Sequence, residues 1–405
     1  MIRRLLHKNR TSISTTHFSV DWMGVLVDQE EWVQEADVIH LHWVAETLSS
    51  ASLGGLTKLR KPVVWTLHDL RPLTGGCHFS AGCQKFLEGC GFCPQLQTDF
   101  FQVTARSLSA MAGAVDGLRP HFVAPSSWMG EQVRASRIGR NHSLSVIPYG
   151  IDSAVFCPGS RQEARRELGL PETEPLILLA GHSLVEKRKG FEHAAGVLSL
   201  FLREIQNTSQ LHAREGKPAL LIAGKDGEDL RLPGWTIHQA GLIPAARMPL
   251  LYRAANVLLF TSTEDNLPNV ILEAMSCGLP VVAHHVGGVP DLLGGLDSCG
   301  ILFSPENPDD GAKGLRRLCN EPEFAKKLAG GGLKKIQEGF TLRHQARRHA
   351  GLYHSLPTPR YLPVDKILEG GAGPLRESCW RFLGERYLRR FSKHNPKAGR
   401  ISVKS

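Results

Sequence analysis

Short apolar runs alternate with longer amphipathic stretches along most of the chain. The apolar runs are mostly continuous in Val, Ile and Leu, as expected for strands buried on both faces of a parallel sheet. The ten predicted strands are Asp37–His42, Pro62–His68, His121–Ala124, Leu144–Pro148, Leu176–Gly181, Ala219–Gly224, Trp235–Gly241, Asn256–Thr261, Leu279–Ala283 and Ile301–Ser304. Helical patterns lie between them, for example at Gly190–Ile205, Ala245–Ala255 and Pro268–Cys277. This alternation predicts a doubly wound α/β fold.

A break in this pattern divides the chain. Prolines and glycines punctuate Pro148–Gly159, and a new series of strands and helices begins after it. We therefore predict one α/β domain at 1–150, a second at 151–356, and a linker with a basic tail at 357–405. The first 36 residues hold no strand that leads into a glycine-rich turn, so we expect the first domain to be incomplete and Met1 to lie inside a longer reading frame.

Composition excludes several classes of protein. No apolar run approaches the ~18–20 residues of a membrane span, and the charged N-terminus has no apolar core behind it, unlike a signal peptide. We therefore expect a cytoplasmic protein whose cysteines are reduced. Residues 371–405 hold nine Lys/Arg against two Asp/Glu, so most of the net charge of +9 lies in the tail. A basic surface for nucleic acid is thus excluded for the rest of the chain.

The tail has a short amphipathic pattern. Trp380, Leu383, Tyr387 and Phe391 can share one face of a helix within 375–391, which also carries several arginines. Two interpretations remain open. The helix either lies on the inner face of the cell membrane as a peripheral contact, or is solvated or docked on the protein.

Residues 256–291 carry the most informative chemistry. A strand ends in Thr/Ser/Glu/Asp, and a helix follows with Pro268 in its first turn and Gly278 just past its end. We expect Asp265 or Asn266 to cap this helix. A second strand then leads into a Gly-Gly turn and another short helix. Two helix N-termini at one sheet edge suit a diphosphate, because their free N–H groups point at it.

This stretch resembles the donor site of retaining GT-B glycosyltransferases of family 4, in the bacterial exopolysaccharide or colanic-acid-type subgroup. The resemblance rests on two acids separated by seven residues, Asp265 and Glu273, within Glu-Asp-Asn-Leu-Pro-Asn, followed by Gly287-Gly288. It implies that Asp265 contacts the hydroxyls of the donor sugar and Glu273 those of the ribose. The family's phosphate contacts fall on the backbone after the first acid, and so on Asn266 and Leu267, and on the glycine pair.

A basic motif follows the strand Leu176–Gly181. In the family, the Lys before a Gly at this place grips the diphosphate, which the resemblance carries to Lys189 and Gly190, and we expect Arg188 to assist. Cations are what the chemistry needs, since negative charge develops on the leaving diphosphate.

The first domain carries a second group of polar residues. The strand Pro62–His68 ends in His68-Asp69, and the resemblance places His68 beside the transferred sugar. Asp37–His42 ends beside Trp43, so His42, Trp43 and Asp69 are candidates for the acceptor side. A pair such as His68-Asp69 also occurs as a plain cap of a helix.

Four cysteines fall within the loop at 75–96. Cys77, Cys83, Cys90 and Cys93 are spaced C-x5-C-x6-C-x2-C. The last pair has the spacing of a metal knuckle, and four thiolates suit a structural Zn²⁺. Free thiols packed in a glycine-rich loop are the alternative, and His78 is a substitute ligand.

Taken together, the resemblance implies a GT-B fold of two Rossmann-like domains facing a cleft. It also implies a retaining transferase without a catalytic cofactor. Its donor would be a nucleotide-diphosphate-sugar and its acceptor a polysaccharide or lipid-linked glycan. Two alternatives remain: a nucleotide-sugar epimerase of the same fold, and a degenerate paralogue that binds a nucleotide or a partner.

Overall fold

The protein is described here by a computed structural model. It describes residues 6, 8–14, 16–206, 217–227, 232–294 and 298–357, and the backbone of 207 and 402–404. The predicted amphipathic helix at 375–391 lies outside these residues.

The first unit is built on a four-stranded parallel sheet in the order β1-β2-β3-β4. Its strands are β1 (Ile39–Leu41), β2 (Val63–Thr66), β3 (His121–Ala124) and β4 (Leu144–Val146). Its helices are α2 (Glu31–Gln34), α3 (Ser50–Thr57), α4 (Val103–Leu118) and α5 (Ser127–Ala135). All four residues of β2 are buried, which agrees with the continuous apolar run that predicted it.

The second unit has a larger sheet, in the order β10-β9-β8-β5-β6-β7-β11, parallel except for β11. Its strands are β5 (Leu176–Ser183), β6 (Ala219–Lys225), β7 (Ile237–Gly241), β8 (Val257–Phe260), β9 (Val281–His284), β10 (Ile301–Phe303) and β11 (Ser402–Lys404). Its helices are α6 (Arg161–Leu168), α7 (Phe191–Asn207), α8 (Met248–Ala254), α9 (Asn269–Ser276), α10 (Val289–Leu293), α11 (Pro308–Asn320), α12 (Pro322–Gly339) and α13 (Leu342–Ser355). Each of the ten predicted strands has its counterpart in β1–β10.

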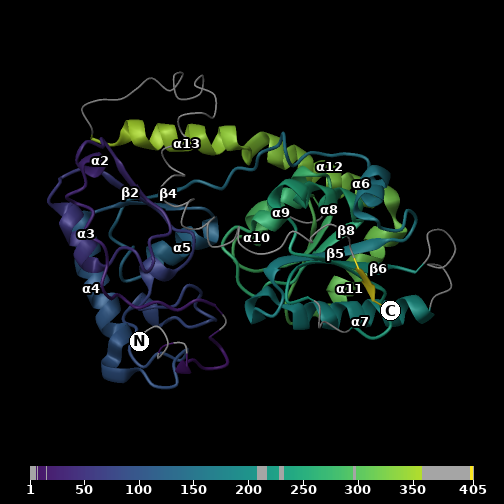
Figure 1. Cartoon of the computed structure of the whole chain (residues 1–405), viewed down its shortest axis with the longest axis horizontal. Coiled ribbons are helices and arrows are strands. Elements are labelled where there is room, and N and C mark those ends of the chain that lie inside the picture. Colours follow the sequence, from purple (N-terminus) through teal and green to yellow (C-terminus); the bar gives the residue numbers. More distant parts are fainter. Residues whose placement is uncertain are drawn as a thin grey trace.

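The second sheet is covered on both faces. Along β5, Leu176 and Leu178 belong to one buried cluster with α8 and α9, while Ile177 and Leu179 belong to another with α7 and α11. This follows from the alternation of side chains along a strand. Figure 1 shows the resulting layers, with α8 and α9 on one side of the sheet and α7 and α11 on the other.

One local expectation was wrong. Pro268 is the N-cap of α9, and no side chain caps that helix, because Asp265 and Asn266 lie further out and are bonded elsewhere. The short helix predicted after the Gly-Gly turn is α10, which has five residues. The end of α9 agrees with the sequence, since Gly278 has φ +74° and its N–H donates to Met275 O.

Helix α13 runs back from the second unit to the first. It follows a backbone bridge between Ile151 and Thr341. Near its other end, Leu352 is buried in a cluster with Val64, Val123 and Ile147 of the first unit. Figure 1 shows α13 spanning the top of the molecule from α12 to the first sheet.

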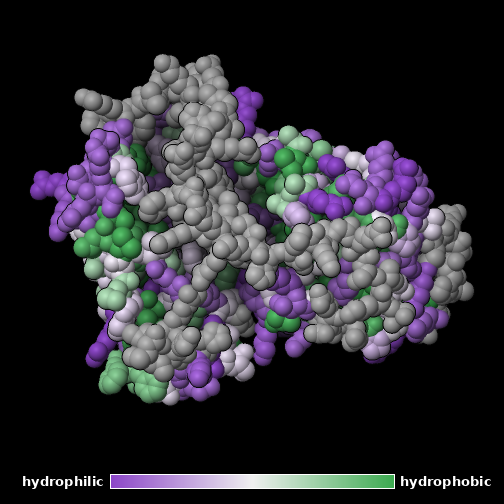
Figure 2. Space-filling model, in the orientation of Figure 1, coloured by the Kyte–Doolittle hydropathy of each residue, from purple (hydrophilic) through white to green (hydrophobic). Residues whose placement is uncertain are grey.

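The two units differ at the surface. Figure 2 shows hydrophilic residues over the second unit near α12 and α6, and apolar residues gathered on the outer side of the first. The exposed large apolar side chains of the first unit include Trp22, Met23, Val25, Leu26 and Trp32. Within the described part of the chain, no helix combines the length and apolar character needed to cross a bilayer.

Candidate functional site

An ion-paired cluster lies where β5 and β8 end. Arg188 and Lys189 are in the 3-10 helix that follows β5, and Asp265 is in the loop that follows β8. Arg188 Nη1 and Lys189 Nζ each lie 2.9 Å from Asp265 Oδ2. The three meet because β5 and β8 are adjacent parallel strands whose carboxyl ends share one sheet edge. Burial alone would raise the pKa of Asp265, but Lys189 and Arg188 lower it below its usual range.

Glycines allow the backbones around this cluster to approach closely. Gly190 has φ +66°, and a Cβ there would lie 1.8 Å from Thr261 O. Gly287 has φ +51°, and its Cβ would lie 1.8 Å from Asp265 O. A Cβ on Gly288 would lie 1.9 Å from Asn266 O, one residue further along the loop that carries Asp265. The glycines predicted to bind phosphate therefore also set the path of the loop that carries Asp265.

Glu273 lies on α9 in the same unit. The hydroxyl of Tyr252, from α8, donates to Glu273 Oε2 at 2.5 Å. Burial raises the pKa of Glu273, and the bond from Tyr252 partly offsets the rise. Leu267, between the two acids, turns its side chain into the hydrophobic core, so only its backbone can serve a ligand. Sequence reasoning missed Tyr252, for which the local pattern holds no signal.

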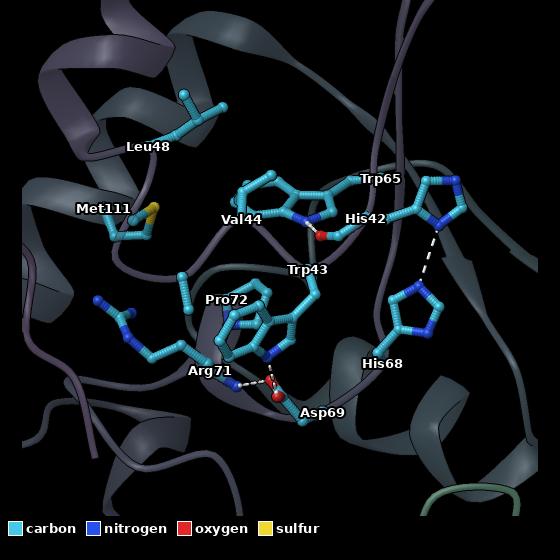
Figure 3. A pocket seen from close by; sticks show the side chains of 11 residues that line it. His42, Trp43, Val44, Leu48, Trp65, His68, Asp69, Arg71, Pro72 and Met111 are labelled. Atoms are coloured by element: carbon cyan, nitrogen blue, oxygen red, sulfur yellow. Dashed lines mark hydrogen bonds between the residues drawn. The ribbon is translucent and has the colours of Figure 1, made fainter. Parts of the chain in front are cut away.

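In the first unit, histidines follow the ends of β1 and β2. His68 Nε2 lies 3.0 Å from His42 Nδ1, and His68 Nδ1 lies 2.8 Å from the Tyr149 hydroxyl. Figure 3 shows His42 and His68 pointing toward one another at the edge of a pocket. Burial, with His42 nearby, lowers the pKa of His68 to about 4. The ring of His68 is thus neutral, and each of its two nitrogens has a hydrogen-bond partner.

These two rings belong to a larger group, the histidine cluster of His40, His42, His68 and His349. The centroids of His40 and His42 are 4.1 Å apart, and those of His40 and His349 are 5.3 Å apart. His40 also bonds to the hydroxyl of Tyr353 from α13, at 2.6 Å. Burial, then the neighbouring imidazoles, lower the pKa of His40 to about 2.

The predicted acceptor-side residues line one pocket together with His68 (Figure 3). Trp43 is 42% exposed, and its indole N–H donates to Asp69 Oδ2 at 2.9 Å. The same oxygen lies 2.7 Å from His78 Nδ1, and Asp69 Oδ1 accepts from the N–H of Arg71. Asp69 is buried, and these bonds occupy both of its oxygens. Asp69 therefore holds the pocket wall together, with two partners on Oδ2 and one on Oδ1.

Two further residues connect the two sides. The amide of Asn266 donates to Leu67 O and His68 O at 2.9 and 3.2 Å, across from one unit to the other. The carboxylate of Glu264 accepts from the backbone N–H groups of Ser80 and Ala81. The sequence predicted Asn266 as a donor-site residue, whereas its side chain is engaged by the first unit. No role was predicted for Glu264, although its position directly before Asp265 in the motif made it a candidate.

The four loop cysteines line one small cavity, of about 20 Å³, and each is a free thiol. Burial raises the pKa of Cys90 to about 11, so its thiol is protonated at neutral pH. Across the described residues, no three His, Cys, Asp or Glu side chains are grouped to hold a metal ion. His78 is engaged by Asp69 and Ser19. The zinc site stays a prediction.

Solved structures match this arrangement of two parallel sheets. Sucrose-phosphate synthase from Thermosynechococcus elongatus matches with a TM-score of 0.57 and 21% identity, over 78% of this chain and 73% of that one. HepE from Anabaena, solved in complex with UDP-glucose, matches with a TM-score of 0.57 and 19% identity, over 80% of each chain. The fold is GT-B, as the sequence predicted.

The second unit defines the relationship more closely. Residues 175–321 match the family described as "Glycosyl transferases group 1". A D-inositol 3-phosphate glycosyltransferase from Nocardiopsis dassonvillei is 32% identical over 250 residues, which cover 58% of this chain and 55% of the relative. The chain spans about half the length of the curated relatives it matches.

Proposed function

We propose that this protein is a retaining glycosyltransferase of the exopolysaccharide type. It transfers a sugar from a nucleotide-diphosphate-sugar to a polysaccharide or lipid-linked glycan. The observation that carries the proposal is the cluster of Arg188, Lys189 and Asp265, which faces His68 across the bridge made by Asn266.

The donor binds to the second unit. Arg188 and Lys189 neutralise the diphosphate, whose charge grows as it leaves. Asp265 and Glu273 accept hydrogen bonds from the sugar and ribose hydroxyls. Since Asp265 is paired with both cations in the free protein, the phosphates take over these cations and release the carboxylate toward the sugar. The curated relatives are named glycosyltransferases, and HepE binds UDP-glucose, so UDP-sugars are the donors to test first.

Transfer follows a front-face path. The acceptor hydroxyl forms a bond to the anomeric carbon on the side from which the diphosphate departs. The bond to the phosphate oxygen breaks, and that oxygen takes the proton of the hydroxyl. A retaining glycosidase would instead need two carboxylates ~5–5.5 Å apart, one as nucleophile. Asp265 is held by two cations and is a poor nucleophile. His68 orients the sugar by exchanging its bond to His42 or Tyr149 for one to a sugar hydroxyl. Trp43 offers an exposed aromatic face to the acceptor.

The test is a panel of nucleotide-sugars with and without a membrane lipid extract. We expect transfer that needs both substrates, and NMR of the product should show the anomeric configuration of the donor. Asp265→Asn should abolish transfer, while Asp309→Asn, on the exposed face of α11, should not. Turnover of the donor alone would indicate an epimerase. No nucleotide release from any donor would overturn the enzyme proposal.

Membrane association is a separate proposal, which rests on the sequence of 375–391 alone. We expect the protein to co-sediment with vesicles that contain anionic lipid, and less so at high salt. Deletion of 375–405 should abolish co-sedimentation. Equal binding to neutral vesicles would contradict this proposal.

The cysteine loop carries a proposal of its own, a structural zinc ion. It is supported by the Cys90-x2-Cys93 spacing and by the four thiols that line one cavity. The thiols would have to draw together around the ion, because no three of them are grouped for a metal in the described residues. Purified protein should contain about one zinc per chain, and Cys90→Ser should remove it. Zinc-free protein that is folded would overturn this proposal.

A further inference from the structure

We propose that Glu264 and Asn266, the two neighbours of Asp265, are positioning residues that join the units, so that closing the cleft also places Asp265. We call their contacts with the first unit the Glu264–Asn266 bridge. The inference rests on the proposed function for the role of Asp265, but the bridge can be tested without any substrate.

Asn266 is matched to its surroundings on the first unit. Its side chain is 3% exposed. Its amide group donates to Leu67 O at 2.9 Å and His68 O at 3.2 Å, just past the end of β2. Its oxygen accepts from Ser126 Oγ at 2.8 Å, at the start of α5. Both N–H donors and the acceptor are used, and a carboxylate could not replace the two donations.

Glu264 makes the complementary contact. Oε1 accepts from the backbone N–H and the hydroxyl of Ser80, at 3.1 and 3.2 Å, and Oε2 accepts from Ala81 N–H at 2.9 Å. The side chain of Gln95 holds this loop by donating to Phe79 O and Ser80 O. An ionised acceptor makes such bonds stronger than neutral ones. The loop is thereby joined to the second unit through its backbone.

The same loop contacts Arg188, one of the two cations that we assign to the diphosphate. The centroid of the Phe79 ring lies 4.0 Å from the guanidinium carbon of Arg188, and Arg188 Nη1 donates to Glu264 O at 2.7 Å. Arg188 is buried beneath this contact, at 8% exposure. Separation of the two units would remove this aromatic cover.

The coupling follows from the order of the three residues. Asp265 is directed to Arg188 and Lys189 of its own unit, while the residues before and after it are directed to the first unit. The Gly287 turn packs against the backbone of Asp265 and leaves the loop little room to move independently. Loss of the bridge therefore changes the position of Asp265 as well as the separation of the units.

The test is Asn266→Asp, which keeps the shape of the side chain and turns two donors into acceptors facing carbonyl oxygens. Asn307→Asp makes the same chemical change at an exposed position and is the matched control. Fluorescent amino acids at the exposed positions 110 on α4 and 326 on α12 report the separation of the units in the substrate-free protein. We expect Asn266→Asp to lower the ratio of closed to open protein about tenfold or more, and Asn307→Asp to leave it unchanged.

Milder variants keep the test valid if Asn266→Asp fails to fold. Ser126→Ala removes the bond to Asn266 and also the side-chain cap of α5, and Glu264→Gln removes a charge, so each should lower the ratio by about three- to tenfold. In an active enzyme, Glu264→Gln should reduce kcat more than it weakens UDP binding, because the side chains that we assign to UDP, Arg188, Lys189 and Glu273, all lie in the second unit.

The outcomes separate the two proposals. A normal ratio in all three bridge variants would overturn the bridge, whether or not transfer is detected. Absence of transfer in the wild type, with a ratio that falls in the variants, would overturn the proposed function and support the bridge. A fall in kcat matched by an equal loss of UDP binding would contradict a positioning role.

Discussion

Buried polar groups differ in charge between the two units. On the second unit, Arg188 and Lys189 remain charged and are paired with the ionised Asp265. On the first unit, His42 and His68 are neutral and hydrogen-bond to each other, because burial lowers their pKa values. The second unit thus offers cations that can bind an anion, and the first unit offers neutral side chains that can bind uncharged groups.

This difference fits the two halves of a transfer reaction. A diphosphate leaving group needs cations, and in the free protein these cations are paired with the carboxylates of Asp265 and Glu186, which offsets part of the cost of their burial. A sugar hydroxyl needs acceptors and donors without net charge, which a neutral imidazole provides. The comparison therefore predicts that substitutions on the charged side affect donor chemistry most.

The largest effect is expected from Lys189→Gln. Loss of one cation from the diphosphate should lower kcat/KM on the order of 10²–10³-fold, as for the loss of a single group that stabilises a developing anion. Lys187→Gln, in the same 3-10 helix but exposed, is the control and should retain activity. An equal loss of kcat/KM in both variants would contradict a specific role for Lys189, the lysine paired with Asp265.

Gly190→Ala tests the backbone beneath the charged side. The φ of +66° and the 1.8 Å approach to Thr261 O should together destabilise the protein by about 1–3 kcal/mol. Gly196→Ala, in α7 and with no atom within 4 Å of its Cβ, should instead stabilise it by about 0.5–1 kcal/mol. Urea denaturation of both variants checks the signs, and a stable Gly190→Ala protein would contradict the packing described here.

Acid tests the neutral side. The pKa of His40 in the folded protein, about 2, lies below its unfolded value of about 6.5. Neutral His40 therefore contributes stability that is present above about pH 6.5 and is lost as the pH falls below it. His40→Asn should flatten the dependence of stability on pH by about 1 kcal/mol per pH unit below this point. His285→Asn, at an exposed position, should keep the wild-type dependence of stability on pH. Urea denaturation of each variant at pH 5 and at pH 7 measures this dependence.

The smallest effect is expected from Tyr149→Phe, which removes the hydroxyl bonded to His68 at 2.8 Å. A bond of this kind contributes about 0.5–1.5 kcal/mol, so kcat should fall by up to about tenfold with donor affinity unchanged. Tyr353→Phe removes the corresponding bond to His40, which is not among the residues that line the pocket, and should change stability more than kcat. A larger effect on donor affinity than on kcat would indicate that Tyr149 contributes to donor binding, and would contradict its assignment to the neutral residues of the first unit.

The sequence predicted the strands because continuous apolar runs are local signals. Lys189 and Asp265 were grouped by the family resemblance, and the structure brings them together because β5 and β8 are adjacent parallel strands that end at one sheet edge. The capping of α9 was predicted wrongly, because Asp265 and Asn266 have distant partners that no local pattern encodes. Glu264 reaches Ser80, 184 residues away, and His40 reaches Tyr353, 313 residues away. Such contacts depend on how the two units meet.

The return of α13 to the first unit has a consequence for synthesis. The buried cluster of Val64, Val123 and Ile147 is completed by Leu352, which leaves the ribosome more than 200 residues later than Ile147. The second unit can fold as it emerges, as domains generally do. The first unit, although made earlier, must wait for the end of α13 with part of its apolar surface uncovered. The unit that is translated first is therefore completed last.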